Sequence, residues 1–322
     1  MRARAVRRLH ANVEAALLDT LGAVVCARLS LHSRLTLRNG DGLFDRWMLR
    51  RSLHASNEAK ACDPLLPWPK SSSAVDPLLV RELEAAQAPR DLALQAARAM
   101  EAAAAAASRW VARSPARAHK PVAIRRVLRR GNRMVIVACG SEAHGVTEEH
   151  LSRLRSMWSG GAAQSVADSD PNFRMDVFCL LQRYASLGGD GFQAALPPRA
   201  FAVLRRRFGV QGECFASPLN CAFGDSFCSA FPDVDSAFGS RGTFFNVVVE
   251  ARERELEGCY EANPPFEETV VDAMALRVAQ LLKAADAAGR ALGFIVVLPE
   301  NCSAPHLARL CGGPHCRRRP LL

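Results

Sequence analysis

The chain has 322 residues, of which 49% are hydrophobic and 23% charged, a balance that is typical of a folded globular protein and excludes a largely disordered one. No apolar run reaches the roughly 18 residues that a membrane-spanning helix needs, so no membrane partner is expected. The formal net charge of +10 is compatible with RNA or DNA as a partner, although an arginine-rich composition by itself gives the same charge.

Eleven cysteines are scattered along the chain without the short spacing of a disulfide framework. Many lie in apolar or strand-like segments, which indicates buried thiols in a reducing compartment. Near the C-terminus, possible zinc ligands gather: Cys302, His306, Cys311, His315 and Cys316. Their spacing matches no standard zinc finger, and no metal site is predicted.

Residues 1–30 are amphipathic and rich in arginine, which predicts one helix. Organellar transit peptides and ordinary surface helices share this pattern. Glu14 and Asp19 favour the surface helix, and organellar targeting stays open as an alternative.

A mainly helical pattern follows. Periodic leucines and alanines over residues 76–113 predict two helices that Pro89 separates. The apolar, β-branched run 133–139 predicts a buried strand, and Thr147 is a predicted helix N-cap. Further helices are predicted at 44–51, 147–158, 173–187 and 198–208.

A stretch rich in Gly, Ala, Ser and Asp, residues 159–171, marks a domain boundary or a long loop. We therefore expect an N-terminal extension over 1–43, a mainly helical domain over 44–170 and an α/β domain over 171–322.

The α/β domain begins with a predicted strand at 210–216, the turn 217–220 and a short helical run to Phe227. A strand, a small-residue turn and a helix form the first half of a mononucleotide-binding unit. The glycine-rich phosphate signature is absent. This argues against a dinucleotide and favours S-adenosylmethionine, which carries no phosphate. The candidate cofactor residues here are small or polar: Glu213, Ala216, Ser217 and Asn220.

A second predicted strand, 228–231, ends in an acidic turn. A carboxylate in this position commonly accepts hydrogen bonds from ribose hydroxyls, and Asp233 or Asp235 is a candidate. An ordinary role for either Asp beside Pro232 in a turn is an equal alternative. The loop 238–242 follows closely and is expected to line the same cleft.

The tetrapeptide Asn263-Pro264-Pro265-Phe266 lies between a predicted strand at 258–262 and a predicted helix at 267–288. An amide side chain can hold an exocyclic amine, prolines stiffen a turn, and a phenyl ring offers a stacking face. Together these groups are suited to a planar nitrogen base. A proline-terminated strand with a core Phe is the alternative. A buried strand at 294–298 completes a second βαβ unit.

Several segments together carry a resemblance to a known family: Phe44–Arg50, Asp63–Pro67, Gln193–Pro197, Arg207–Val210, Glu213–Cys221, Cys228–Asp233, Phe238–Gly242 and Glu261–Phe266. In this order, Glu-Cys-Phe-Ala-Ser-Pro-Leu-Asn-Cys and Glu-Ala-Asn-Pro-Pro-Phe are highly specific. The chain resembles the cap-specific adenosine N6-methyltransferase family, also named for phosphorylated-CTD-interacting factor. The resemblance covers about residues 44–300.

The resemblance implies a Rossmann-like S-adenosylmethionine-dependent methyltransferase domain packed against a helical domain. The activity would be methyl transfer to N6 of the adenosine beside the 5′ cap of mRNA, and the compartment would be the nucleus. The implied residues follow, with the catalytic motif first: Asn263, Pro264, Pro265 and Phe266. Those bordering the cofactor are Glu213, Phe215, Ala216, Ser217, Pro218, Asn220, Asp233 and Asp235. Those holding the cap and RNA are Arg46, Arg50, Phe238, Gly239, Ser240 and Arg241.

Two features depart from the family pattern. Trp47 and Trp68 are spaced as in a WW domain, but the aromatic central strand and the later proline are absent. No WW domain is assigned, and a partnership with the RNA polymerase II C-terminal domain is left in doubt. After Leu298 the family continues into further strands, so the last strands of the sheet are expected to be missing here.

Two other functions stay open. An incomplete sheet with a basic surface also fits a catalytically impaired, RNA-binding relative. A motif of Asn, Pro, Pro and an aromatic residue also serves methyltransferases that act on DNA adenine, another nucleic acid or a protein glutamine.

Overall fold

The structure is a computed structural model. It describes residues 2–36, 43–55, 75–113, 120–129, 132–159, 168–185, 195–224, 226–246, 256–299 and 305–316. Two compact units are distinguished, one of Met1–Ala118 with Arg183–Phe192 and the other of His119–Gln182 with Gln193–Leu322. The domain boundaries expected at 43/44 and 170/171 stay predictions. No helix in these described ranges is both long and apolar enough to cross a membrane.

In the described residues of Met1–Ala118, the first unit contains the helices α1 (Arg2–Thr36), α2 (Leu43–Ala55), α3 (Pro77–Ala85) and α4 (Arg90–Arg113). Small side chains on α4 allow α1 to pack closely against it, because Ala93, Ala96 and Ala97 are all fully buried. The break at Pro89 between α3 and α4 is confirmed. The predicted N-terminal helix is also present, with non-helical backbone at Gly22, where φ is 75°.

The second unit begins with an antiparallel sheet of β1 (Ala123–Arg129), β2 (Asn132–Cys139) and β3 (Glu142–Thr147). Helices α5 (Glu148–Met157) and α6 (Pro171–Ala185) follow. The sequence predicted only β2 of these three strands, and the mainly helical domain expected over 44–170 stays a prediction. The N-cap at Thr147 is confirmed, since its side chain accepts a hydrogen bond from the His150 N–H.

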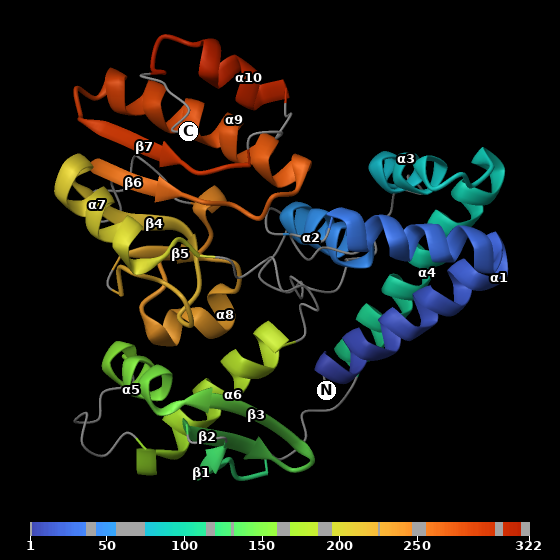
Figure 1. Ribbon diagram of the computed structural model, residues 1–322, viewed down its shortest axis with the longest axis horizontal. Coiled ribbons are helices and arrows are strands. Elements are labelled where there is room, and N and C mark those ends of the chain that lie inside the picture. The colour runs from blue at the N-terminus through green and yellow to red at the C-terminus, as the bar shows by residue number, and fades with distance from the viewer. Residues whose placement is uncertain are drawn as a thin grey trace. The chain divides into compact units, whose positions relative to one another are not determined.

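A parallel sheet forms the rest of this unit (Figure 1), with β4 (Val210–Ala216), β5 (Phe227–Ser229), β6 (Gly258–Ala262) and β7 (Leu292–Val296). Its strand order is β5-β4-β6-β7, and every neighbouring pair is parallel. The helices around it are α7 (Pro198–Phe208), α8 (Pro232–Asp235), α9 (Glu268–Ala287) and α10 (Pro305–Gly312), with single 3₁₀ turns η3 (Ser236–Phe238) and η4 (Phe244–Asn246).

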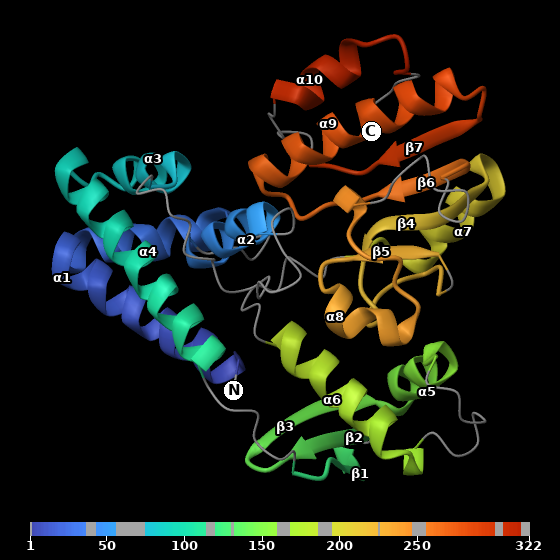
Figure 2. The same cartoon turned by 180° about the vertical axis from the view of Figure 1, so that it is seen from behind.

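Helices lie on both faces of this sheet, as continuous apolar strands require. The larger core cluster joins Tyr260 of β6 to Val271, Met274 and Val278 of α9. A smaller cluster on the other face joins Val210 of β4 to Phe201 of α7 and to Phe223. Figure 2 shows α9 and α7 beside the sheet from the reverse side.

Most predicted elements of this region are confirmed, and β4, β6 and α7 have the expected bounds. The predicted helical run before Phe227 was wrong. Ser217 and Asn220 form local hydrogen bonds that close a turn instead, and such side chains compete with helix formation. In the described residues, β7 pairs with β6 alone, and the free side of β5 is bonded to the loop at Arg241 and Gly242.

Candidate active site

The strand order creates a natural place for a ligand. From the central strand β4, the chain proceeds to β5 on one side and then to β6 on the other. In an open parallel sheet, ligands bind outside the carboxyl ends of the strands where the strand order reverses. Ser217 directly follows β4, and Asn263 directly follows β6. The structure therefore brings two of the predicted sequence motifs to the same edge of the sheet.

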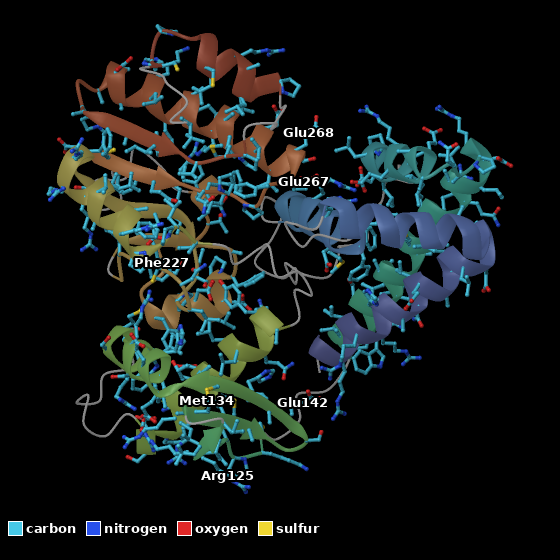
Figure 3. The ribbon with its side chains drawn as sticks, in the orientation of Figure 1. Arg125, Met134, Glu142, Phe227, Glu267 and Glu268 are labelled. Atoms are coloured by element: carbon cyan, nitrogen blue, oxygen red, sulfur yellow. The ribbon has the colours of Figure 1, made fainter. Side chains whose placement is uncertain are left out.

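The Asn263–Phe266 tetrapeptide is held as a defined turn between β6 and α9. The Glu267 N–H donates to the Pro265 carbonyl oxygen at 2.8 Å, and Glu267 Oε2 accepts from the Val270 N–H at 3.1 Å. Glu267 therefore caps α9. Pro264 is buried, whereas Asn263 and Phe266 are half-buried. Figure 3 labels Glu267 and Glu268 at the start of this helix.

The turn after β4 is organised around Glu213, which is 4% exposed. Its Oε2 accepts hydrogen bonds from the N–H groups of Ala222, at 2.6 Å, and Phe223, at 3.0 Å. Asn220 Oδ1 accepts from the Ser217 N–H at 2.8 Å and from the Ser217 hydroxyl at 2.9 Å. These bonds fix the backbone that would face a cofactor.

The remaining predicted cofactor residues lie close to the strand ends. Pro218 is buried in the turn, and Ala216 ends β4. Phe215 packs its ring against Phe244 and Phe245, with centroids 5.3 and 5.8 Å apart. Whether any of these residues touches a cofactor stays a prediction.

The two acidic candidates after β5 differ in their surroundings. Asp235 is fully buried, and its Oδ2 accepts from the Phe231 N–H at 3.1 Å, which closes the short helix α8. Asp233 is exposed in the same helix. Exposure leaves Asp233 the better placed of the two for a ribose, and neither role is tested.

The predicted substrate loop runs along β5. Ser240 Oγ lies 2.5 Å from Ser229 Oγ, and the Arg241 N–H donates to the Phe227 carbonyl oxygen at 2.9 Å. Phe238 is fully buried, whereas Gly239 and Arg241 are exposed. Because φ of Gly239 is 88°, a residue with a side chain would be strained there.

The other predicted substrate residues, Arg46 and Arg50, belong to the first unit. The sequence suggested exposed arginines, but Arg50 is 3% exposed. Its guanidinium contacts Asp76 at 2.9 Å and Glu82 at 3.2 Å, and Arg46 also contacts Glu82, at 2.9 Å. These ion pairs join α2 to α3. A role for either arginine in RNA binding stays a prediction.

Sequence reasoning missed Glu261. This residue lies in β6 directly opposite Glu213 in β4 and is 1% exposed. Burial, together with the nearby Glu213, raises the pKa of Glu261 to about 8. Burial also raises the pKa of Glu213. The available signal was a carboxylate inside a short, otherwise uncharged strand, two residues before Asn263.

The cysteines near this site are suited to packing. Burial raises the pKa of Cys221 to about 11 and that of Cys228 to about 12, so both remain protonated thiols at neutral pH. Within the described residues, no three His, Cys, Asp or Glu side chains gather as they would around a metal ion.

Comparison with known proteins identifies the family of the chain. A family model described as "Phosphorylated CTD interacting factor 1 WW domain" matches residues 153–322, more than half of the chain. The proteins from Mus musculus and Homo sapiens named "mRNA (2'-O-methyladenosine-N(6)-)-methyltransferase" are each 38% identical to this chain over 175 residues.

The matched region covers 52% of this chain and 23% of each of these relatives. The chain therefore spans about a quarter of the length of the curated relatives it matches. The parallel sheet, both strand-end motifs and α9 all lie in the residues that the family model matches. The resemblance identified from the sequence is thus confirmed, and the chain belongs to the phosphorylated CTD interacting factor family.

Proposed function

We propose that this protein transfers a methyl group from S-adenosylmethionine to N6 of the adenosine beside the cap of mRNA. The observation that carries the proposal is the position of Asn263–Phe266 at the carboxyl end of β6, next to the turn that follows β4. The names of the mouse and human relatives supply the substrate class. The sheet would then be the core of a Rossmann-like methyltransferase domain.

The residues around the strand ends fit this cofactor. Ala216 and Ser217 have small side chains, which leave room beside the backbone. The exposed carboxylate of Asp233 follows β5 and has the chemistry to accept from ribose hydroxyls. When bound, S-adenosylmethionine supplies an electrophilic methyl group.

The tetrapeptide would hold the adenine. The side-chain amide of Asn263 and the carbonyl oxygen of Pro264 would accept hydrogen bonds from the N6 amine, and Phe266 would stack on the ring. These bonds would increase electron density on N6 and align it with the methyl group, so that placement supplies most of the rate. As the bond between N6 and the methyl group forms, the methyl–sulfur bond of the cofactor would break to leave S-adenosylhomocysteine. The proton displaced from N6 would then pass to solvent, so no general base is required in this step.

The decisive assay measures methyl transfer from labelled S-adenosylmethionine to capped RNA whose first nucleotide is 2′-O-methyladenosine or guanosine. We expect labelling of the first RNA only. Equal labelling of both RNAs would exclude an adenine-directed reaction. Capped RNA, uncapped RNA and DNA that share one adenine context separate a cap substrate from another nucleic acid.

Substitutions at Asn263 and Phe266 test the roles proposed for these two residues. Asn263→Ala should lower the rate by roughly 10²-fold or more, because small losses of alignment are costly. Asn246→Ala changes an exposed Asn of η4 and is the matched control.

Phe266→Ala should weaken RNA binding by about 1–3 kcal/mol, the usual contribution of a stacked base. Trp110→Ala, which alters a 41% exposed aromatic residue on α4, is its control.

A non-catalytic, RNA-binding function is the second candidate. The exposed arginines Arg205, Arg206 and Arg207 in the last turn of α7 favour it, since they present positive charge to phosphates. Calorimetry with S-adenosylmethionine separates the two functions. Binding supports the enzyme, whereas its absence in a folded sample that still binds RNA supports the second candidate. Residence in the nucleus is part of the proposal and can be tested with a fluorescent fusion.

A further inference from the structure

Two buried carboxyl groups lie opposite each other across the central strands of the parallel sheet. Glu213 in β4 and Glu261 in β6 are partners in the strand register, and they are 4% and 1% exposed. Neighbouring strands are about 4.8 Å apart, and partners in a parallel pair point to the same face. The two side chains therefore share one buried environment at the ligand-binding edge of the sheet.

Their hydrogen bonding is unequal. Glu213 Oε2 accepts from two backbone N–H groups, those of Ala222 and Phe223, which favours its ionised form. Among the described residues, neither oxygen of Glu261 has a hydrogen-bond partner. A buried carboxylate without a donor is costly, whereas a neutral carboxylic acid needs only an acceptor. Glu213, the register partner of Glu261 in β4, carries an acceptor of suitable charge.

Nearby arginines further favour the ionised form of Glu213 over that of Glu261. Arg153 and Arg205 both favour the ionised form of Glu213. Arg205 also donates to the Ala222 carbonyl oxygen at 3.1 Å, so it belongs to the same turn. No arginine or lysine acts in this way on Glu261, for which the one charged influence identified in the described structure is Glu213 itself.

The other groups of these strands that lie near the pair are neutral. Ile295 of β7 is the register partner of Glu261 on its second side. Burial raises the pKa of the Cys214 thiol in β4 and of the Cys259 thiol in β6, so neither supplies a charge at neutral pH. Glu213 has two N–H donors and nearby arginines, whereas neither oxygen of Glu261 has a hydrogen-bond partner among the described residues. Protonation of Glu261 is therefore the less costly way to relieve the repulsion between the two carboxyl groups.

We propose that Glu261 is a positioning residue of the methyl-transfer site, which in its neutral form donates a hydrogen bond to the Glu213 carboxylate. This inference rests on the proposed function. The shared proton joins the end of β6, which carries Asn263, to the side chain that holds the turn after β4. The base-binding turn and the cofactor-binding turn are thereby kept at a fixed separation.

Cofactor affinity is expected to fall at alkaline pH. The pKa of Glu261 is raised to about 8, first by burial and then by Glu213. Above that pH, two negative charges lie side by side and the hydrogen bond is lost. The ends of β4 and β6 then move apart, and cofactor affinity falls.

The first test does not depend on the enzymatic activity. The full chain, labelled with ¹³C at its glutamate carboxyl carbons, is titrated by NMR. The expected result is one carboxyl that titrates near pH 8 in the wild type and is absent from Glu261→Gln. Glu257→Gln, which changes an exposed glutamate just before β6, should leave this signal in place. Assignment of Glu261 to an ordinary carboxyl titration, around pH 4–5, would overturn the inference.

The second test measures S-adenosylmethionine affinity by calorimetry as a function of pH. Wild-type affinity should weaken by up to about tenfold per pH unit above the Glu261 pKa, since one proton is linked to binding. Glu261→Gln retains an N–H donor and should bind without this dependence, and Glu261→Leu should bind weakly at every pH.

The outcomes remain distinguishable. Identical pH profiles in the wild type and Glu261→Gln would exclude the positioning role. A failure of every form to bind the cofactor would refute the proposed function and this role with it, while the NMR titration still reports on the shared proton.

Discussion

The first unit and the parallel sheet differ in how their buried charged groups are paired. Between α2 and α3, the guanidinium of Arg50 is 3% exposed and is matched by the carboxylates of Asp76 and Glu82. Between β4 and β6, two carboxyl groups are buried together, and burial raises the pKa of both. Matched charge holds two helices together. An unmatched pair, meaning two buried carboxyl groups with shifted pKa values, is typical of functional sites, and here the pair lies beside the predicted catalytic motif.

The largest effect is expected when the ion pairs of Arg50 with Asp76 and Glu82 are broken. Arg50→Ala should lower the free energy of unfolding by about 3–5 kcal/mol, because Asp76 and Glu82 would lose a buried partner. Urea denaturation measures this. Arg90→Ala is the control, since Arg90 pairs with Glu84 at 3.5 Å but is 79% exposed, and its loss should cost at most about 1 kcal/mol. Equal effects would mean that burial does not determine the strength of these ion pairs.

The second effect is the pH dependence of the free energy of unfolding, which tests the Glu213–Glu261 pair. The pKa of Glu261 is about 8 in the folded chain and near its ordinary value of 4.5 when unfolded. Between these values the folded state holds a proton that the unfolded state has released. Stability therefore falls as pH rises, by about 1.4 kcal/mol per unit, or roughly 3 kcal/mol from about pH 5 to pH 7.

Urea denaturation at a series of pH values checks this slope. The stabilisation from neutral Glu261 should be complete below about pH 4.5 and lost by about pH 8. Glu261→Gln should flatten the curve in that window, and Glu257→Gln should not. A wild-type stability that rises with pH over this window would contradict the inferred protonation state.

The third effect concerns the ionised member of the pair. Glu213→Ala should destabilise the fold by about 2 kcal/mol, since the buried N–H groups of Ala222 and Phe223 would lose their acceptor. It should also abolish S-adenosylmethionine binding by releasing the turn after β4. Normal cofactor affinity in a folded Glu213→Ala sample would separate Glu213 from the site.

The smallest effect is expected at the start of α5, away from both the Arg50 ion pairs and the Glu213–Glu261 pair. Thr147→Ala removes the N-cap of α5 and should cost about 1 kcal/mol, without changing cofactor affinity. Ser156→Ala, at an exposed serine of the same helix, is the control and should cost a few tenths of that. Thermal denaturation together with calorimetry checks both parts. A loss of cofactor binding in Thr147→Ala would extend the site to α5.

Much of the parallel sheet could be predicted from local pattern. The strands β4 and β6 are short, largely apolar segments between turn residues, and α7 is bracketed by Pro198 and Gly209, so their bounds follow from the chain itself. The strands β1 and β3 could not be predicted in this way. Arg125 and Arg126 in β1 and Gly145 in β3 interrupt the apolar pattern, and these strands depend on pairing with β2.

The sequence by itself determined the family, the β6-α9-β7 unit and the strand-to-helix turn at Asn263–Phe266, because these depend on residues that are neighbours along the chain. Tertiary structure alone decided which motifs meet. The order β5-β4-β6-β7 places the ends of β4 and β6 side by side and sets Glu261 against Glu213, although 48 positions separate them. A pKa depends on burial and on nearby charge, so the special state of Glu261 exists only once the sheet has formed.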